Sequence, residues 1–527
     1  MQAGDIRGSK SYPRYPVMDE MQLRSTDSAT LDRLLETATA DFVVASNRQP
    51  YRHDYGADGD IDVTRPAGGL TAGLDEVMQR VEGTWIAWGD GEADRAVVDG
   101  EDTVTVPPDS EVYDLQRLWF SEEVIEDYYY RISNQLLWPL CHAALATVEA
   151  SGDAWSQYRE VNDEFAAAIA DRADSDGIVW LQDYHLALTP RQVRERASTD
   201  PFLAHSWHIP WPAWDTFRAA PHRREIVRGL LGNDLLTFHV PRYCANFLET
   251  AESALDETLV DYAAGQVTYR DRTTTVRPFP MGVPADRIRA EATGMEAAGF
   301  REAFKRTHGI DADTTIAIGV DRLDYSKGIP ERLAALDTLF ELYPQWRGDV
   351  TYVQVGTETR SWIPAYARYQ KRVERAVDDV NDHHATADWR PVVYTTDMIS
   401  NEGLAGLYRA ADLALVSPIR DGMNLVCQEY IAAQADDDTG VLLLSDQAGA
   451  HDVLGEWVVS IRPYDTTGFA DAIDEALTMP TAERERRFDA LESTVLDNDI
   501  EQWVRDVLAT VTTLTEADEP GAQDASH

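Results

Sequence analysis

The stretch Val320-Asp-Arg-Leu-Asp-Tyr-Ser-Lys-Gly328 follows directly on the apolar run Thr315-Ile-Ala-Ile-Gly319. An apolar run followed by a polar loop that ends in glycine is typical of a buried strand leading to the mouth of a parallel sheet. Open α/β sheets bind their ligands beyond the carboxyl ends of the strands, which is where Arg322 and Lys327 then lie. We therefore expect an α/β fold whose ligand site includes these two cations.

Lysine is rare in this chain, which relies on arginine for most of its basic side chains. Its only lysines are Lys10, Lys305, Lys327 and Lys371. A lysine supplies a compact point charge, and phosphate oxygens are a frequent partner of such a charge. Lys327, together with Arg322, therefore predicts a site for a phosphate-bearing ligand.

The composition excludes some classes of partner. The chain has 527 residues, 44% of them hydrophobic, so it can bury a large core and form two domains. Its 47 basic residues stand against 92 acidic ones, a formal net charge of -45. Nucleic acids and anionic membranes require a broad basic surface, and we expect neither as a partner. The acidic residues are spread along the chain, which resembles proteins adapted to concentrated salt, where screening weakens self-repulsion.

The cysteines and the amino terminus give no sign of secretion. Cys141, Cys244 and Cys427 are far apart and form no CxxC pair, so the sequence predicts neither a disulfide framework nor a zinc site. Residues 1–21 contain no apolar core of a signal peptide, and no apolar run is long enough to cross a bilayer. We therefore expect a cytoplasmic protein.

Short apolar runs alternate with longer helical patterns along most of the chain. This alternation predicts parallel sheets with helices on both faces, and a polar stretch at 281–290 separates two such sets. We expect two Rossmann-like domains that face each other across a cleft. The expected strands are Phe42–Ala45, Ile178–Leu181, Ala204–His208, Leu235–His239, Ile316–Val320, Thr351–Val355, Val392–Tyr394, Leu413–Val416, Val441–Leu444 and Val458–Ile461.

The same pattern sets the expected domain limits. Residues 1–40 are polar and form an amino-terminal extension. The two Rossmann-like domains cover 41–283 and 284–495, and a helix at 496–515 packs back on the first domain. The last residues, 516–527, are acidic and rich in small residues, which predicts disorder.

A second polar loop, Ser417-Pro-Ile-Arg-Asp-Gly-Met-Asn-Leu-Val-Cys-Gln-Glu-Tyr430, follows the strand expected at Leu413–Val416. Gly422 allows a tight turn, and a helix is expected from about Met423. The free amides at a helix start bind phosphate or sugar oxygens. Glu429 then lies one to two turns inside the helix, within reach of a sugar that follows the phosphates. The plainer alternative is that Asp421 caps the helix and Glu429 is a solvated residue.

The two loops together resemble those of the retaining glycosyltransferases of trehalose-6-phosphate synthase type, glycosyltransferase family 20. The resemblance extends in the family's order from about residue 41 to 510 and implies the two-domain GT-B fold. The further matching motifs are Ser46-Asn-Arg48, Ala67-Gly-Gly-Leu70, Asn134-Gln-Leu-Leu-Trp-Pro139, Trp180-Leu-Gln-Asp-Tyr-His-Leu186, His208-Ile-Pro-Trp-Pro212, Ser445-Asp-Gln-Ala-Gly449 and Arg462-Pro-Tyr-Asp465.

The resemblance implies how a nucleotide-sugar donor is held. Arg322 and Lys327 would bind its diphosphate, where charge develops as the anomeric bond breaks. Glu429 would bind the ribose, and Asp421 would hold the transferred glucose. The remaining implied donor contacts are Gly69, Val355, Ile399, Leu404, Gly422, Met423, Asn424, Leu425 and Val426. For Val355, Ile399 and Leu404, which would line the base pocket, plain core packing is a near-equal reading.

The acceptor side rests on a second group of residues. Arg48 ends a strand-like run, and a guanidinium forks onto phosphate oxygens. By the resemblance, Tyr129, Trp138 and Arg360 join Arg48 around the phosphate of glucose 6-phosphate. The alternative for the aromatic residues is a core stripe at helical spacing.

Asp183 and His208 each follow an apolar strand, so both are expected at the cleft. By the resemblance, they would contact the reacting sugars and serve with Arg322 and Lys327 as catalytic residues. Their plainer readings are a turn-capping aspartate and a hydrogen-bonded core histidine.

The implied reaction transfers glucose from a nucleotide-glucose to glucose 6-phosphate with retention, giving α,α-trehalose 6-phosphate. We expect neither a metal site nor a cofactor, and a separate protein would remove the product's phosphate. A homo-oligomer is left open, as is the choice of UDP, ADP or GDP. The rivals are a transferase with another acceptor such as glycerol 3-phosphate, and a catalytically silent regulatory homologue. Departures from the family pattern at Gln49, Gln182 and Trp211 fall on the acceptor side.

Overall fold

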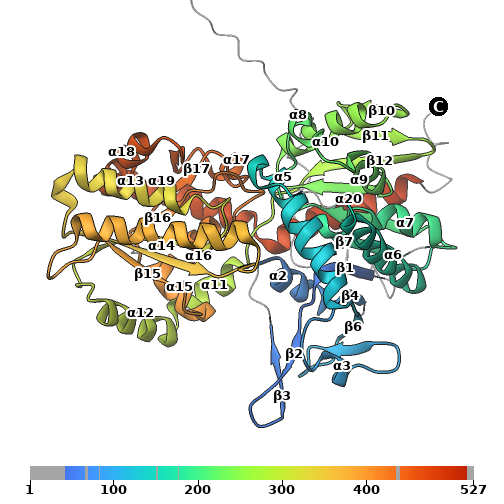
Figure 1. Ribbon diagram of the computed structural model, residues 1–527, viewed down its shortest axis with the longest axis horizontal. Helices are drawn as coiled ribbons and strands as arrows, with labels where there is room; N and C mark the ends of the chain where they lie inside the picture. The colour runs from blue at the N-terminus through green and yellow to red at the C-terminus, as the bar shows by residue number, and fades with distance from the viewer. Residues whose placement is uncertain are drawn as a thin grey trace, which may run out of the picture.

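The computed structural model describes residues 42–65, 69–81, 83–149, 152–175, 177–434 and 439–518. The chain forms two lobes, each with its own large sheet and helices (Figure 1). This arrangement confirms the α/β class predicted from the alternating pattern. The expected extension 1–40 lies outside the described residues.

The sheet of the second lobe is parallel throughout and runs in the order β15-β14-β13-β16-β17-β18. Counted along the chain, this is the 3-2-1-4-5-6 strand order of a Rossmann fold. Along β13, Ile316 and Ile318 pack on one face and Ala317 on the other, as the two-residue period of a strand requires. The strands are β13 (Thr315–Arg322), β14 (Val350–Thr357), β15 (Val392–Thr395), β16 (Leu413–Val416), β17 (Val441–Ser445) and β18 (Val459–Ile461).

Separate hydrophobic clusters cover the two faces of this sheet. One face carries α11 (Ala285–Thr293), α12 (Met295–His308), α15 (Asn401–Ala410), α16 (Val426–Ala433), α17 (His451–Leu454) and α19 (Thr481–Asp497). The other face carries α13 (Ile329–Leu342), α14 (Pro364–His384) and α18 (Thr466–Leu477), with the short η4 (Pro344–Trp346) after α13.

The ten-stranded sheet of the first lobe runs in the order β10-β11-β12-β9-β8-β7-β1-β4-β6-β5. Its part from β6 to β9 is parallel and repeats the 3-2-1-4-5-6 order. The strands are β1 (Phe42–Arg48), β4 (Thr84–Trp88), β5 (Thr103–Val106), β6 (Tyr113–Leu118), β7 (Ile178–Gln182), β8 (Phe202–Ser206), β9 (Leu235–Phe238), β10 (Thr258–Asp261), β11 (Gln266–Tyr269) and β12 (Arg272–Pro278). A separate hairpin, β2 (Arg52–Tyr55) with β3 (Ile61–Thr64), projects from this lobe (Figure 1).

The helices of the first lobe include a π-helical segment, η1 (Glu126–Leu137), between α4 (Glu122–Ile125) and α5 (Trp138–Cys141). Wide helical turns of this kind occur frequently at functional sites. The other helices are α2 (Gly69–Met78), α3 (Asp94–Val97), η2 (Leu145–Thr147), α6 (Ala154–Arg172), η3 (Tyr184–Leu186), α7 (Thr189–Arg196), α8 (Trp214–Phe217), α9 (Arg223–Leu230) and α10 (Pro241–Ala254).

The last helix, α20 (Ile500–Asp518), packs against the sheet of the first lobe. Trp503 lies on Trp180 of β7, with 5.0 Å between their ring centroids. The prediction that disorder begins at residue 516 is wrong for 516–518, because the helix continues to Asp518, while 519–527 lie outside the described residues. The prediction that a strand reaches His208 is also wrong, because β8 ends at Ser206.

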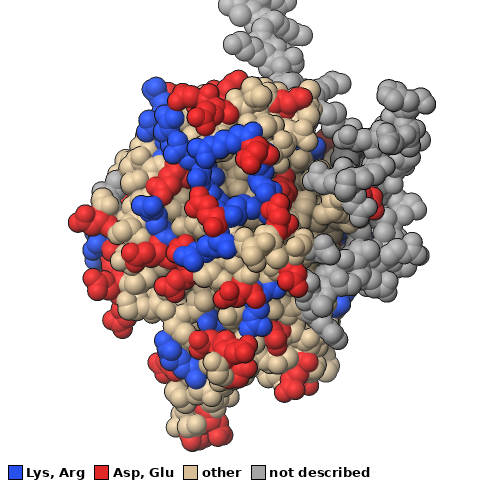
Figure 2. All heavy atoms as spheres, turned by 90° about the vertical axis from the view of Figure 1, so that its right-hand side faces the viewer, with Lys and Arg blue, Asp and Glu red and all other residues tan. Residues whose placement is uncertain are grey.

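The surface charge and the helix lengths bear on the expectation that neither nucleic acids nor membranes are partners. On the face of the first lobe shown in Figure 2, basic side chains lie among acidic ones rather than in one broad patch. None of the helices in the described ranges is long and apolar enough to cross a bilayer.

Candidate active site

A cavity of about 440 Å³ lies between the lobes, and side chains of both line it. The loops that reach it leave β1 and β7 in one sheet and β13 and β16 in the other, at the points where each strand order reverses. Ligands of open α/β folds bind at these points. The predicted residues that line the cavity are Arg48, Tyr129, Trp138, Asp183 and His208 from the first lobe and Arg322, Lys327, Arg360, Asp421, Met423, Asn424, Leu425 and Val426 from the second.

The two cations singled out by the sequence both line this cavity. Arg322 is the last residue of β13, and its guanidinium lies over the Trp138 ring, 5.3 Å from the ring centroid. Among the described residues, no carboxylate lies within ion-pair distance of Arg322. Lys327 donates from Nζ to Asp421 Oδ2 at 2.5 Å, and both side chains are largely buried. One cation is thus held by an aromatic face and the other by a carboxylate.

The loop before α16 brings the second lobe into backbone contact with the first. A Cβ atom at Gly422 would lie 2.0 Å from the carbonyl oxygen of His208, so only glycine fits there. The predicted helix start near Met423 is wrong by three residues, because α16 begins at Val426. Asn424 has a φ of 86°, a left-handed conformation that asparagine tolerates better than most residues.

Asp421 is fixed by three donors at the floor of this loop. Besides Lys327, the Asn424 side-chain amide donates to its Oδ2 at 3.0 Å and the Gly422 N–H donates to its Oδ1 at 3.0 Å. Burial alone would raise the pKa of Asp421, but the Lys327 ammonium lowers that pKa below its ordinary value. The group is therefore a carboxylate, an acceptor for hydroxyl groups.

Several predicted donor residues do not line the cavity. Glu429 is in the first turns of α16, where its Oε2 accepts from the Tyr408 hydroxyl at 3.0 Å and burial raises its pKa. Gly69 begins α2. The other three, Val355, Ile399 and Leu404, belong to or pack on the core of the second lobe. Their part in donor binding stays a prediction.

The acceptor end of the cavity contains an unusual tyrosine. Arg48 ends β1, and its Nη2 donates to the Tyr129 hydroxyl at 3.3 Å. Burial by itself would raise the pKa of Tyr129, but the guanidiniums of Arg360 and Arg48 lower the pKa to about 8. The ring stacks on His185, at 5.7 Å between centroids. Two positive groups therefore converge around one phenol oxygen.

Arg360 reaches this end from the second lobe. Its guanidinium lies over Trp138, 4.6 Å from the ring centroid, and Nη1 donates to the Tyr366 hydroxyl at 2.7 Å. Asp324 Oδ2 lies 3.7 Å from Arg360 Nη1. Arg360 Nε and Trp138 Nε1 are buried without a hydrogen-bond partner in the described part of the chain. Unpaired buried donors are costly, so these two indicate a missing acceptor.

Asp183 follows β7 in a strained conformation, with a φ of 69°. Its Oδ1 accepts from the His208 N–H at 3.2 Å. Burial raises the pKa of this carboxyl to about 6, although that backbone hydrogen bond opposes the rise. Strain at a residue that lines a cavity is typical of a functional position.

A row of hydrogen-bonded side chains orients His208. His208 Nδ1 lies 3.2 Å from His239 Nε2, and His208 Nε2 lies 2.9 Å from Gln182 Oε1. His239 Nδ1 in turn lies 3.3 Å from the Phe279 carbonyl oxygen. Burial lowers the pKa of His208 well below its ordinary value, so the imidazole is neutral.

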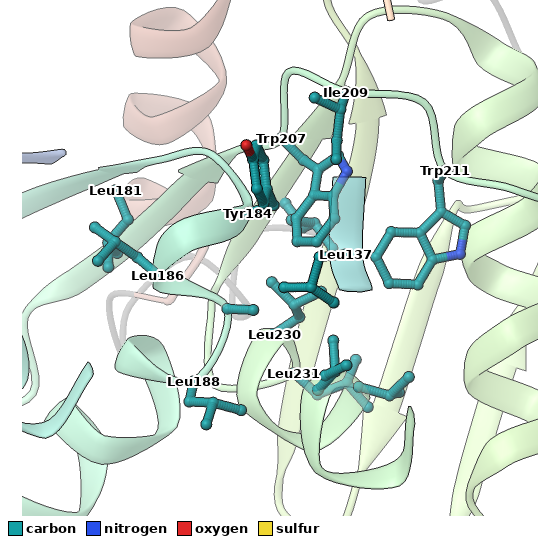
Figure 3. Packing of buried hydrophobic residues seen from close by; sticks show 14 of the residues in the cluster. Leu137, Leu181, Tyr184, Leu186, Leu188, Trp207, Ile209, Trp211, Leu230 and Leu231 are labelled. Atoms are coloured by element: carbon teal, nitrogen blue, oxygen red, sulfur yellow. The ribbon is translucent and has the colours of Figure 1, made fainter. Parts of the chain in front are cut away.

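Buried indoles support the segment that carries His208 (Figure 3). Trp207 contacts Tyr184 and Trp211, with ring centroids 6.3 Å and 5.0 Å apart. Trp211 is fully buried, and its Nε1 donates to Thr250 Oγ1 at 3.1 Å. Of the departures at Gln49, Gln182 and Trp211, only Gln182 lines the cavity, because Gln49 is buried against Asp94.

Some polar residues that line the cavity were not among the predicted site residues. Asn47, Gln182 and His239 lie at or just beyond the carboxyl ends of β1, β7 and β9. A polar residue at the end of an apolar strand was the signal that identified Asp183, and it would have found these three. His185 also lines the cavity, beside Tyr129.

Outside the cleft, Asp337, His383 and His384 could together hold a metal ion. Asp337 Oδ1 lies 3.1 Å from His383 Nδ1 and 2.8 Å from His384 Nε2. None of the three lines the cavity, so the group takes no part in the site described above.

Comparison with known proteins gives a consistent result. The model of Glycosyltransferase family 20 matches residues 40–513. The Dictyostelium discoideum UDP-forming alpha,alpha-trehalose-phosphate synthase A is 31% identical over 466 residues, 88% of this chain, which spans only 61% of that relative's length. The trehalose-6-phosphate synthase of Mycolicibacterium vanbaalenii is 34% identical over 479 residues, covering 89% of this chain and 95% of the relative.

Solved structures agree with this. The E. coli protein solved bound with UDP-2-fluoro glucose has a TM-score of 0.78 and 30% identity, covering 90% of this chain and 99% of that one. A Burkholderia xenovorans alpha,alpha-trehalose-phosphate synthase solved with glucose-6-phosphate has a TM-score of 0.79 and 28% identity, covering 90% of this chain and 100% of that one. The match confirms the GT-B type of fold. The chain therefore belongs to glycosyltransferase family 20, among the trehalose-phosphate synthases.

Proposed function

We propose that the protein transfers glucose from a nucleotide-glucose donor to glucose 6-phosphate with retention, giving α,α-trehalose 6-phosphate and a nucleoside diphosphate. The observation that carries this proposal is that two pairs of cations open on one cavity. Arg322 and Lys327 suit a diphosphate, and Arg48 with Arg360 suits the phosphate of a second substrate.

The relatives support both substrate classes. The E. coli protein binds an analogue of UDP-glucose, and the Burkholderia xenovorans protein binds glucose-6-phosphate. This chain has a positively charged place for each. Arg360 and Trp138, which each keep one buried donor without a partner among the described residues, both line this cavity.

The first pair of cations acts where charge develops. As the bond from the anomeric carbon to the diphosphate oxygen breaks, negative charge grows on the departing phosphate, beside Arg322 and Lys327. The acceptor hydroxyl forms the new bond on the same face, and its proton passes to the leaving phosphate oxygen. One glycosidic bond forms as one bond from the anomeric carbon to phosphate breaks, and the nucleoside diphosphate leaves with the acceptor's proton, so atoms and charge balance.

The carboxylates in the cavity hold sugars rather than attack them. Asp421 is bound by Lys327 and Asn424, which leaves it suited to accept from glucose hydroxyls. Asp183 accepts a backbone N–H from His208. The Asp183 carboxylate can accept hydrogen bonds from sugar hydroxyls beside the anomeric carbon. The neutral His208 ring, whose two nitrogens already face His239 and Gln182, would steady the sugar by contact.

A donor-by-acceptor screen tests the proposal. UDP-, ADP- and GDP-glucose are each incubated with glucose 6-phosphate or glycerol 3-phosphate, and the product is identified by NMR. We expect a 1,1-linked product with both anomeric protons in the α configuration, formed from glucose 6-phosphate only. A glycerol adduct, a β linkage, or no nucleoside diphosphate from any pair would refute it.

A further inference from the structure

A second large cavity, of about 760 Å³, lies in the second lobe at the end of the sheet opposite the active site. Asp412 and Gly440, which immediately precede β16 and β17, line it. The active-site loops instead follow β13 and β16. The cavity therefore shares a sheet with the active site but opens at its amino-terminal edge.

The charge of this cavity contrasts with the rest of the molecule. Among the described residues that line it, five are basic and three, Glu302, Asp412 and Glu485, are acidic, whereas the whole chain has 47 basic and 92 acidic residues. The basic ones come from α12, the end of α15 and the start of α19. They are Arg301, Lys305, Arg306, Arg409 and Arg484.

These cations are largely without partners of their own. In the described ranges, no carboxylate lies within ion-pair distance of Lys305, Arg306, Arg409 or Arg484, and Arg301 only approaches Glu302 at 4.0 Å. Asp412 is engaged elsewhere, since its Oδ2 accepts from the Ile316 N–H at 2.8 Å. Arg409 Nη1 and Arg484 Nε are buried with no hydrogen-bond partner among the residues that the structure describes.

The plainer interpretation is that these side chains balance the ends of α12 and α15, where cations are favoured. Arg484 lies in the first turn of α19, where a cation is not favoured, and among the described residues neither Arg409 nor Arg484 donates to a terminal helix carbonyl group. Buried guanidinium donors that stay unpaired are costly, and several cations held together repel one another. A bound anion would offset the repulsion among the cations.

We propose that this cavity binds a small molecule carrying two or more phosphate groups, at a site separate from the active site. Its volume is in the range of small-molecule sites, which favours a metabolite over a macromolecule. Arginines bind phosphate oxygens in pairs, and five cations provide for more than one phosphate.

Hydrogen–deuterium exchange of the full chain tests this, with inorganic pyrophosphate as the probe at constant ionic strength. Because pyrophosphate also suits the active site, the two sites are separated by position. We expect slower exchange in peptides covering 301–312 and 406–412, in addition to any change at 321–328. Protection confined to 321–328, or protection reproduced by potassium chloride at equal ionic strength, would overturn the proposal.

Variants sharpen the result. Arg409→Gln with Arg484→Gln should weaken pyrophosphate binding at 406–412 at least tenfold and leave 321–328 as in the wild type. Arg306→Gln, at the exposed rim of the cavity, should weaken pyrophosphate binding at 406–412 several-fold. This single variant still tests the proposal if the double variant does not fold. Arg131→Gln with Arg372→Gln, two exposed arginines outside the cavity, is the matched control. Equal binding by wild type, double variant and rim variant would refute the site.

Discussion

Replacing Asp183 with asparagine separates the stability of the active site from its activity. The carboxyl is buried at the cavity, and its pKa is raised from 3.8 to about 6. Asparagine keeps the shape and can still accept from the His208 N–H, but it carries no charge. We therefore expect Asp183→Asn to stabilise the protein near neutral pH while it impairs the transfer of glucose, as charged active-site groups often trade stability for function.

The size of the effect follows from the pKa. A folded-state pKa above the unfolded value means that the protonated carboxyl stabilises, a contribution complete below about pH 4 and lost as the pH rises through about 6. Each pKa unit corresponds to about 1.4 kcal/mol, so the charged group costs at most about 3 kcal/mol near pH 8. Near pH 5 the cost is about half of that. The figure is an upper value because the carboxyl opens partly on the cavity.

Urea unfolding of wild type and Asp183→Asn near pH 5 and pH 8 measures this difference. The variant should gain up to about 3 kcal/mol near pH 8 and clearly less near pH 5, while its kcat/KM falls about 10- to 100-fold. Asp58→Asn, an exposed residue of the hairpin, is the control and should change stability by less than about 0.5 kcal/mol. A variant destabilised equally at both pH values would refute the raised pKa.

Three further predictions concern the cations of the cavity. Lys327→Ala should lower kcat about 100- to 1000-fold, because a group that stabilises developing charge is lost. The control Lys371→Ala, exposed on α14, should leave kcat unchanged. Near-normal turnover by Lys327→Ala would count against the role of Lys327. Arg48→Ala should raise the KM for glucose 6-phosphate about 10- to 100-fold with little change in kcat, because a charge-assisted hydrogen bond is lost. Arg52→Ala is its control. An unchanged KM in Arg48→Ala would contradict the assignment. Arg360→Gln should move the pKa of Tyr129 upward from about 8, measured by NMR titration of the labelled ring, and an unmoved pKa would show that this guanidinium does not act on the phenol.

Much of the fold could be predicted from the sequence where strands are buried on both faces. The strands of the second lobe are continuous apolar runs such as Leu413–Val416, whose limits agree with β16. Six strands of the first lobe's sheet were missed, namely β4, β5, β6, β10, β11 and β12. Of these, β10 and β11 alternate polar and apolar residues near one edge, and β5 is the edge strand at the other end. Edge strands owe their place to pairing with a neighbour, which a local pattern does not show.

Some residues of the active site could likewise be predicted from local sequence, and others could not. Arg322 ends an apolar strand, and Lys327 and Asp421 lie in loops that follow apolar strands, so local sequence predicted them at the cavity. The contact between Arg360 and Trp138 joins the two lobes and depends on how they pack together. No local pattern reports such a contact, and only the resemblance to a family suggested it.

The most direct test of the central claim is a crystal structure with a nucleoside diphosphate and glucose 6-phosphate bound together. We expect the diphosphate oxygens within hydrogen-bond distance of Arg322 and Lys327, and the sugar phosphate among Arg48, Tyr129 and Arg360. A diphosphate bound away from these two cations, or a sugar phosphate that touches neither Arg48 nor Arg360, would contradict it.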